Sequence, residues 1–239
     1  MPVETFPLKA VIFDFDGVIV DSEPLHYRAF QKVLKPFGLH FSFDEYLEYY
    51  IGFDDRDAFK EAFRQEGREL SGGKLSELIG SKSMVFEEIV RKDIKPFPGA
   101  KGLVREVANH GIPMAIASGA LRNEIELILK MLSLRAFFKV IVSADRVTRS
   151  KPDPETYKVA VEELKKDLGL ESLEPELCVA IEDTPAGVQS AKGAGLRVIA
   201  VGHSYNLEDL ADADCVVERL ADLSFSIMVQ VVKDVREIP

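Results

Sequence analysis

The chain has 239 residues, of which 46% are hydrophobic and 29% are charged. This balance is typical of a globular protein with a sizeable core, and it excludes a disordered or fibrous chain. The formal net charge of -10 argues against binding to nucleic acid or to an anionic membrane surface, because both require a basic face. We therefore expect no nucleic-acid partner and no membrane association.

The cysteines and the N-terminal residues indicate in which cellular compartment the protein resides. Cys178 and Cys215 have no CxxC spacing, so we expect reduced thiols in the core rather than a disulfide or a zinc site. The segment Met1–Phe6 lacks a basic region followed by a long apolar run, and no uncharged apolar run of about 18 residues occurs. These features predict a cytoplasmic protein.

Short apolar runs rich in β-branched residues recur along the chain, each bounded by polar or glycine-containing turns. The runs cover residues 9–15, 114–118, 139–143, 178–182 and 197–201, and a weaker one covers residues 215–217. Parallel strands that are buried on both faces have this pattern. We therefore predict a buried parallel sheet with a weaker edge strand.

Stretches with helical periodicity lie between these runs. They cover residues 100–110, 121–132, 154–168 and 185–194, and a final helix is expected over residues 223–235. Thr184 before Pro185 is typical of a helix start, in which a polar side chain caps the helix and proline takes its first position. Asp153 before Pro154 has the same pattern. The alternation of strands and helices predicts an α/β fold, a Rossmann-like three-layer parallel sheet that binds ligands beyond the carboxyl ends of its strands.

The region from residue 22 to residue 96 interrupts this alternation. It looks helical throughout, has no strand-like apolar run, and is too long for a single crossover. Residues 95–99 contain two prolines and a glycine, which suit a stiff return linker. We therefore predict a catalytic core formed by residues 1–21 and 97–239, with an inserted α-helical cap formed by residues 22–96.

Two carboxylates follow the first predicted strand. On an extended backbone Asp14 and Asp16 share a face and can converge on one site, and Gly17 lets the chain turn away from a ligand. Two close carboxylates need a compensating cation, and Mg²⁺ prefers oxygen ligands of this kind. Glu182 and Asp183, at the end of the fourth predicted strand, can supply further oxygen atoms. The sequence therefore predicts a magnesium site in which Asp183 or Glu182 completes the ligand set begun by Asp14 and Asp16.

Polar groups at two other strand ends suit a phosphoryl group. Ser118 and Gly119 follow the second strand, where a hydroxyl and backbone amides of a sheet of this type bind phosphate oxygens. Lys151 follows the third strand and supplies a fixed positive charge, which can offset both the carboxylates and the charge that develops during phosphoryl transfer. We therefore expect the partner to be a small phosphorylated metabolite.

These four segments, in this order, resemble the signature of the haloacid dehalogenase superfamily of phosphatases and phosphomutases. The resemblance covers nearly the whole chain, and the helical insertion is similar to the small cap of the branch that contains β-phosphoglucomutase and phosphoglycolate phosphatase. It implies that Asp14 is the nucleophile, which becomes an aspartyl-phosphate, and that Asp16 is the general acid and base. It also implies that Ser118 and Lys151 bind the phosphoryl group. Mg²⁺ would bind the side chains of Asp14 and Asp183 and the backbone carbonyl of Asp16.

The cap contains three candidate substrate-binding residues. Arg56 and Lys82 can hold the distal end of a substrate or can be solvated helix charges, and His26 lies near the predicted hinge, where it contacts substrate or stabilises the hinge. Arg56 falls one residue later than the basic residue of the mutase pattern, and Asp16 disfavours both a dehalogenase and a phosphonate-cleaving enzyme. We therefore predict a Mg²⁺-dependent phosphatase for a sugar phosphate or a phosphoglycolate-type substrate, with β-phosphoglucomutase as the alternative. We expect a monomer.

Overall fold

A computed structural model describes residues 7–51, 53–170 and 172–233 of the chain. Within them, six strands form one sheet in the order β3-β2-β1-β4-β5-β6, and every pair of neighbours is parallel. The strands are β1 (Ala10–Phe13), β2 (Met114–Ala117), β3 (Phe138–Val142), β4 (Cys178–Glu182), β5 (Arg197–Val201) and β6 (Cys215–Val217). The predicted parallel sheet is therefore confirmed, with β6 at one edge and β3 at the other.

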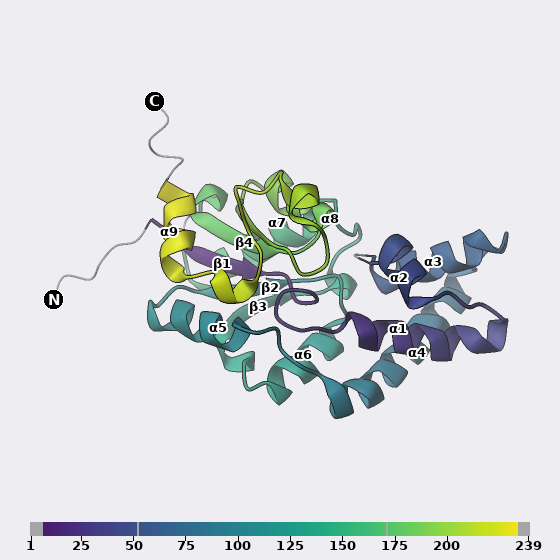
Figure 1. Ribbon diagram of the computed structural model, residues 1–239. Helices are drawn as coiled ribbons and strands as arrows, with labels where there is room; N and C mark the ends of the chain where they lie inside the picture. The colour runs from purple at the N-terminus through teal and green to yellow at the C-terminus, as the bar shows by residue number, and fades with distance from the viewer. Residues whose placement is uncertain (1–6, 52, 171, 234–239) are drawn as a thin grey trace.

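Helices cover both faces of the sheet (Figure 1). They are α5 (Ala100–Asn109), α6 (Arg122–Met131) and α9 (Phe225–Lys233) on one face, and α7 (Glu155–Asp167) and α8 (Pro185–Gly193) on the other. Large side chains such as Phe13, Ile116 and Ile181 pack toward α5, α6 and α9. Alanines such as Ala115 and Ala180 face α7 and α8, which lets these two helices pack closely on the sheet. The predicted three-layer α/β fold is thus confirmed.

The helix starts match the expected signals to within one residue. The Thr184 side chain caps α8, and Pro185 is its first residue, as predicted. α7 begins one residue later than the sequence predicts, at Glu155, and Pro154 is its flanking residue. The Asp153 carboxylate still accepts a hydrogen bond from the Glu155 amide at 2.9 Å. The expected end of α9 at residue 235 lies outside the described residues. No described helix has the length and apolar character needed to span a bilayer.

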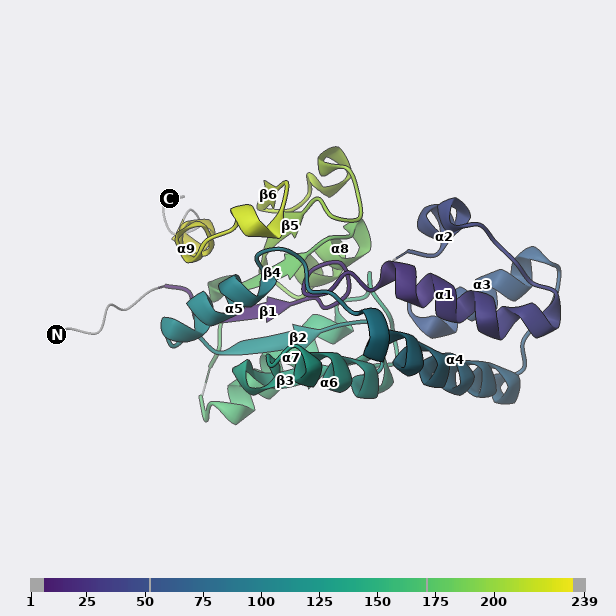
Figure 2. The same cartoon turned by 60° about the horizontal axis from the view of Figure 1, so that its bottom comes forward.

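Among the described residues, four α-helices form a separate layer beyond the carboxyl ends of the strands (Figure 2). They are α1 (Glu23–Leu34), α2 (Phe43–Tyr49), α3 (Asp55–Gln65) and α4 (Gly72–Asp93). Their facing sides bury a hydrophobic core of their own, in which aromatic residues such as Phe30, Phe41, Tyr46, Phe59 and Phe63 predominate. A second core shows that this layer does not depend on the sheet for all of its burial.

The chain crosses between the sheet and this helical layer twice, and the two crossings lie side by side. Val20 and Pro96 form an isolated antiparallel bridge. The amide of Asp21 donates a hydrogen bond to the carbonyl of Lys95 at 3.1 Å. On this basis we propose that the cap comprises residues 22–96 and that the rest of the chain forms the core.

Candidate active site

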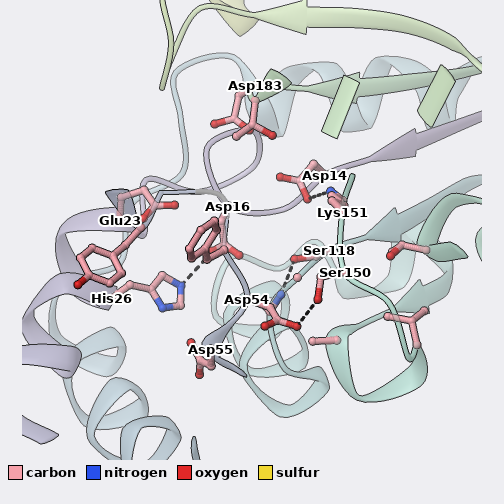
Figure 3. Close-up of a pocket in the computed structure, with 18 of the residues that line it drawn as sticks. Asp14, Asp16, Glu23, His26, Asp54, Asp55, Ser118, Ser150, Lys151 and Asp183 are labelled. Carbon is pink, nitrogen blue, oxygen red and sulfur yellow. Dashed lines mark hydrogen bonds and ion pairs between the residues drawn. The ribbon is translucent and has the colours of Figure 1, made fainter. Parts of the chain in front are cut away.

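The carboxyl ends of β1, β2 and β4 lie at the edge of the sheet that faces the cap. β1 is at the switch point of the strand order, where connections leave in opposite directions and a crevice opens for a ligand. A pocket lies here between the sheet and the cap (Figure 3). The predicted site residues that line it are Asp14, Asp16, His26, Ser118, Gly119, Lys151 and Asp183. Glu182, Arg56 and Lys82 are not part of its wall.

Lys151 forms two close ion pairs at the edge of the sheet. Its Nζ lies 2.7 Å from Asp14 Oδ1 and 2.6 Å from Glu182 Oε1. Tyr157 of α7 donates a hydrogen bond to the same Glu182 oxygen at 2.6 Å. Burial raises the pKa of Asp14 to about 8, while Lys151 opposes this rise and Glu182 adds to it. Burial alone would lower the pKa of Lys151, but the two carboxylates raise it above its ordinary value, so Lys151 is a fixed cation.

The carboxylates of Asp14, Glu182 and Asp183 form one buried acidic cluster. Each offers an oxygen atom within 4.8 Å of the others. Oδ2 of Asp183 accepts a hydrogen bond from Ser204, whereas its Oδ1 is buried without a hydrogen-bond donor among the described residues. Burial raises the pKa of Asp183 well above its usual range, and the two neighbouring carboxylates add to this rise. A divalent cation with oxygen ligands would relieve this repulsion, so the cluster fits a magnesium site.

Two glycines make room for these carboxylates. Gly17 has a φ of +78°, and a Cβ atom built on it would lie 1.8 Å from Asp183 Oδ2. A Cβ atom on Gly187, in the first turn of α8, would lie 2.0 Å from Glu182 Cδ. A side chain at either position would displace a carboxylate of the cluster. The glycines therefore determine how closely the first loop and α8 approach the site.

Asp16 lines the same pocket, but its carboxylate turns toward the cap (Figure 3). Its Oδ1 accepts hydrogen bonds from the Ser22 hydroxyl and, at 3.4 Å, from His26 Nε2. Nζ of Lys82 lies 2.7 Å from His26 Nδ1, so Nδ1 is the acceptor and Nε2 carries the proton. Burial alone would raise the pKa of Asp16, but the hydrogen bonds from His26 and from the Ser22 hydroxyl lower it. Asp14 and Asp16 thus share one pocket, although their carboxylates have different partners.

The loop after β2 presents a hydroxyl to the pocket. Ser118 is buried, and its amide donates a hydrogen bond to the carbonyl of Val142 on β3 at 2.9 Å. Its Oγ accepts a hydrogen bond from the amide of Ala120 at 3.0 Å. A hydroxyl that accepts in this way keeps its own proton for donation to a ligand oxygen. Gly119 also lines the pocket, so both residues of the loop after β2 that we expect to bind phosphate face it.

Arg56 and Lys82 have other partners than a substrate. Nε and Nη2 of Arg56 lie 2.9 and 2.7 Å from Asp54 Oδ2, and Nη2 is 3.4 Å from Ser150 Oγ of the core. Lys82 is fully buried, with its Nζ 2.8 Å from Asp55 Oδ1. The geometry therefore does not support the expectation that these two cations hold the distal end of a substrate. Each is neutralised by a cap carboxylate.

Three further residues support the site and were not expected. Ser204 bonds to Asp183, and His203 Nδ1 lies 2.7 Å from the carbonyl oxygen of Gly17. Both follow β5, so the rule that ligands gather at strand ends could have indicated them. Tyr157 lies inside a helix, and its contact with Glu182 leaves no local signal in the sequence.

Comparison with known proteins decides the family. The sequence model described as "Haloacid dehalogenase-like hydrolase" matches residues 11–201. The chain belongs to the haloacid dehalogenase-like hydrolases. The resemblance predicted from the four motif segments is thereby confirmed.

Members of this hydrolase family from several organisms align along most of the chain. A phosphorylated carbohydrates phosphatase from Thermotoga maritima is 32% identical over 83% of this chain and 88% of its own length. The β-phosphoglucomutase of Bacillus subtilis is 28% identical over 92% of this chain and 94% of its own. The chain is therefore an enzyme of the phosphatase type within this family.

Solved structures of the family have the same fold. The crystal structure of CbbY from Rhodobacter sphaeroides in complex with phosphate has a TM-score of 0.82 and 27% identity, and the match covers 93% of this chain and 99% of that one. A second crystal structure, of mutant CbbY, contains xylulose 1,5-bisphosphate and has a TM-score of 0.80 and 28% identity, over 91% of this chain and 96% of that one. Both matches include the core and the cap, so the core-and-cap architecture of the family extends to this chain.

Proposed function

We propose that the chain is a Mg²⁺-dependent phosphatase that hydrolyses a small phosphorylated metabolite through an aspartyl-phosphate on Asp14. The observation that carries the proposal is the position of Asp14 at the end of β1, with the Lys151 ammonium 2.7 Å from its Oδ1. Ser118 and Asp183 follow the two strands that flank β1. A nucleophilic carboxylate, a fixed cation, a hydroxyl donor and a metal ligand thus meet at one sheet edge.

The acidic cluster supplies the ligands of the proposed Mg²⁺ ion. We assign the side chains of Asp14 and Asp183 and the backbone carbonyl of Asp16 to the ion, with Glu182 beside them. Oε1 of Glu182 already accepts hydrogen bonds from Lys151 and Tyr157, so its main task is to hold Lys151 next to Asp14. A bound Mg²⁺ ion would neutralise negative charge between the phosphate and the carboxylates.

In the first step a carboxylate oxygen of Asp14 attacks the phosphorus atom. The bond between phosphorus and the ester oxygen breaks, and the leaving alkoxide takes a proton from Asp16. Ser118 and Lys151 donate hydrogen bonds to the phosphoryl oxygens and stabilise the charge of the transition state. The products of this step are the alcohol and a phosphorylated Asp14.

In the second step Asp16, now a carboxylate, takes a proton from a water molecule. The water oxygen attacks the phosphorus atom, and the bond between phosphorus and Asp14 breaks. Inorganic phosphate leaves, and Asp14 returns to its free form. The hydrogen bonds from Ser22 and His26, which lower the pKa of Asp16, favour its basic form in the arrangement described.

The proposal is tested by phosphate release. The enzyme is incubated with Mg²⁺ and a panel of sugar phosphates and phosphoglycolate, and Asp14→Asn serves as the blank. Mass spectrometry after an acid quench locates the phosphorylated residue. Release that depends on Asp14, with phosphate trapped on that residue, supports the proposal. Undiminished release by Asp14→Asn would overturn it.

β-Phosphoglucomutase activity is the alternative, and the relative from Bacillus subtilis supports it. The same residues would serve, because a mutase differs only in transferring the phosphoryl group to a sugar hydroxyl in place of water. An assay with β-glucose 1-phosphate and glucose 1,6-bisphosphate separates the two activities. Formation of glucose 6-phosphate with little free phosphate would establish the mutase.

The similarity to CbbY adds bisphosphates to the candidate substrates, since that protein was crystallised with one. Sugar monophosphates, phosphoglycolate and sugar bisphosphates all present the same reacting group to Asp14. They differ in the charge of their other end. The reacting residues alone therefore do not discriminate among them.

A further inference from the structure

The cap side of the pocket is acidic and aromatic. Its charged residues are Glu23, Asp54 and Asp55, and its rings belong to Phe30, Tyr46, Tyr50 and Phe53. Among the described residues that line the pocket, Lys151 is the only lysine or arginine, and it lies on the sheet side in contact with Asp14. A substrate whose phosphoryl group meets Asp14 directs its other end toward the acidic wall.

Arg56 is not available to offset the negative charge of this wall when a ligand binds. Its guanidinium is bound to Asp54, which is buried, and it also reaches Ser150 of the core. The same Asp54 oxygen accepts a hydrogen bond from the Ser150 hydroxyl at 2.6 Å. Turning Arg56 toward a ligand would leave Asp54 buried without its charge partner, which is strongly unfavourable.

Lys82 is likewise bound to other residues of the protein and is not available to a ligand. It has no exposed surface, and its ammonium group is 2.8 Å from Asp55 Oδ1, 2.7 Å from His26 Nδ1 and 4.0 Å from Glu124 Oε2. The other oxygen of Asp55 is buried without a hydrogen-bond donor among the described residues. The negative charge of the carboxylates around Lys82 therefore already exceeds the single positive charge of its ammonium group.

Glu23 is the acidic residue of the wall that lies beside Asp16 and His26 (Figure 3). It is the first residue of α1, and Figure 3 shows it with His26 on the cap side of Asp16. The Tyr46 hydroxyl donates a hydrogen bond to its Oε2 at 2.5 Å, which fixes the direction of the carboxyl group. Unlike Asp54 and Asp55, Glu23 has no arginine or lysine as an ion-pair partner among the described residues.

We propose that this pocket selects phosphate monoesters whose other end is neutral and carries hydroxyl groups, and that it rejects a second phosphate or a carboxylate there. The inference rests on the proposed function and names the substrate class of the same site. An anionic end would face the Glu23 carboxylate, which has no lysine or arginine partner among the described residues, and like charges repel strongly where solvent is largely excluded. A hydroxyl can instead donate to Glu23, while the carbon skeleton packs on the aromatic rings. Glu23 is thus the specificity-determining residue.

The test compares substrates that differ in the charge of the distal group. The values of kcat/KM are measured with Mg²⁺ for two pairs of a neutral and an anionic substrate. The pairs are glycerol 1-phosphate with 3-phosphoglycerate, and fructose 1-phosphate with fructose 1,6-bisphosphate. Phosphoethanolamine is measured as the substrate with a cationic end. We expect each neutral substrate to exceed its anionic counterpart by about tenfold or more. Glu23→Gln should lower the ratio of kcat/KM for the neutral substrate to that for the anionic substrate several-fold in both pairs. Glu48→Gln, on the exposed side of α2, should leave both ratios unchanged. Equal or better turnover of the anionic substrates, or a preference for phosphoethanolamine, would overturn the inference.

The affinity of the same compounds for Asp14→Asn can be measured without turnover. Titration calorimetry with the same compounds and Mg²⁺ is expected to rank neutral ends above anionic ends. If the wild type releases no phosphate from any compound, including p-nitrophenyl phosphate, the proposed function fails, while the calorimetric ranking still decides the selectivity. A tighter complex with the bisphosphate would contradict the inference even if the enzyme proves to be a phosphatase.

Discussion

His203 Nδ1 lies 2.7 Å from the carbonyl oxygen of Gly17, although 186 residues separate the two positions in the chain. The other ring nitrogen accepts a hydrogen bond from the amide of Leu220 at 3.2 Å. Nδ1 therefore carries the proton, and the ring is neutral. The ring also stacks on Phe97 of the return linker, with 4.0 Å between the ring centroids. One imidazole thus holds the loop that carries Asp14 and Asp16 against the linker to the cap.

The first prediction concerns the role of His203 as a positioning residue. His203→Phe keeps the stacking on Phe97 but removes both hydrogen bonds, and it should cost roughly 1 kcal/mol of stability per bond and lower kcat more than it raises KM. His203→Asn places an amide nitrogen near the position of Nδ1 and should recover part of kcat. Steady-state kinetics and urea unfolding measure these effects. Wild-type kcat in His203→Phe would show that the contact does not position the loop.

His203 also predicts a pH dependence of stability. Burial lowers its pKa below the ordinary value of 6.5, and the Gly17 carbonyl and Asp21 only partly oppose this. The unfolded chain therefore binds the proton first as the pH falls, so the stabilising contribution is present above pH 6.5 and is lost below it. The free energy of unfolding measured near pH 7.5 and 5.5 should fall more for the wild type than for His203→Asn. Identical pH profiles would contradict this.

The second prediction concerns the metal. Mg²⁺ should raise the Tm of the wild type, because a ligand that binds only the folded state stabilises it by mass action, and EDTA should abolish activity. In Asp183→Asn the Mg²⁺ shift should disappear. The metal-free variant should have a higher Tm than the metal-free wild type, by roughly 2–4 °C per kcal/mol, because an uncompensated buried carboxylate is gone. Differential scanning fluorimetry with and without Mg²⁺ measures both effects, and a Mg²⁺ shift that survives in Asp183→Asn would refute the assignment.

The same cluster gives the metal-free protein its own pH profile. The pKa of Asp14 is raised from 3.8 to about 8 by burial, with Lys151 acting against this and Glu182 adding to it. The folded state therefore keeps a proton that the unfolded state releases, so this contribution is complete below about pH 4 and is lost as the pH rises toward 8. Unfolding in EDTA across this range should show the loss, and Mg²⁺ should reduce it. A profile in EDTA that does not depend on Asp14, tested with Asp14→Asn, would contradict the expectation.

The third prediction concerns the space beside Glu182. Gly187→Ala should displace the carboxylate of Glu182, because the added Cβ would lie 2.0 Å from its Cδ. We expect a stability loss of about 1–3 kcal/mol and a fall in kcat of at least tenfold, since Lys151 loses one of its two partners. Gly102→Ala is the matched control, because a Cβ on this glycine of α5 meets nothing within 4 Å. It should be neutral or stabilising by up to about 1 kcal/mol. Equal effects of the two substitutions would show that the contact with Glu182 is unimportant.

The fourth prediction concerns the thiols, both of which are free, as expected from the sequence. Burial raises the pKa of Cys178 to about 12, and it raises that of the half-buried Cys215 as well. In the native protein near pH 8, a thiol reagent should therefore modify Cys178 not at all and Cys215 slowly. Both should react after denaturation. Rapid native modification of Cys215→Ser would show that Cys178 is accessible.

The residues at strand ends were predictable because two local rules combine there. A short apolar run indicates a buried strand, and parallel strands bring their carboxyl ends to one edge, so Asp14, Ser118 and Asp183 could be placed together without coordinates. The cap of α8 by Thr184 was predictable for the same reason, since it depends on neighbours within three residues. Such short-range sequence patterns predict the same strand end or helix cap whatever the rest of the fold.

The orientation of cap side chains was not predictable in this way. The sequence offers Arg56 as a substrate-binding cation or a solvated helix charge, but its partners include Ser150, which is 94 residues away. The direction of the Asp16 carboxylate depends on His26, which in turn depends on Lys82 in another helix. Such contacts follow from how the helical layer is placed on the sheet. Periodicity and spacing carry no information on that placement.

The adjacent crossings between core and cap have a consequence for how the molecule is assembled. Because Val20 and Pro96 are paired neighbours, the chain leaves and re-enters the core at almost one point. The sheet order β3-β2-β1-β4-β5-β6 takes no strand from the intervening segment. A short turn between these two residues would therefore close the core without rethreading it. In the same way, a helical layer from another family member could be exchanged there, and such a chimera would exchange the acidic wall while leaving the phosphoryl-transfer residues of the core in place.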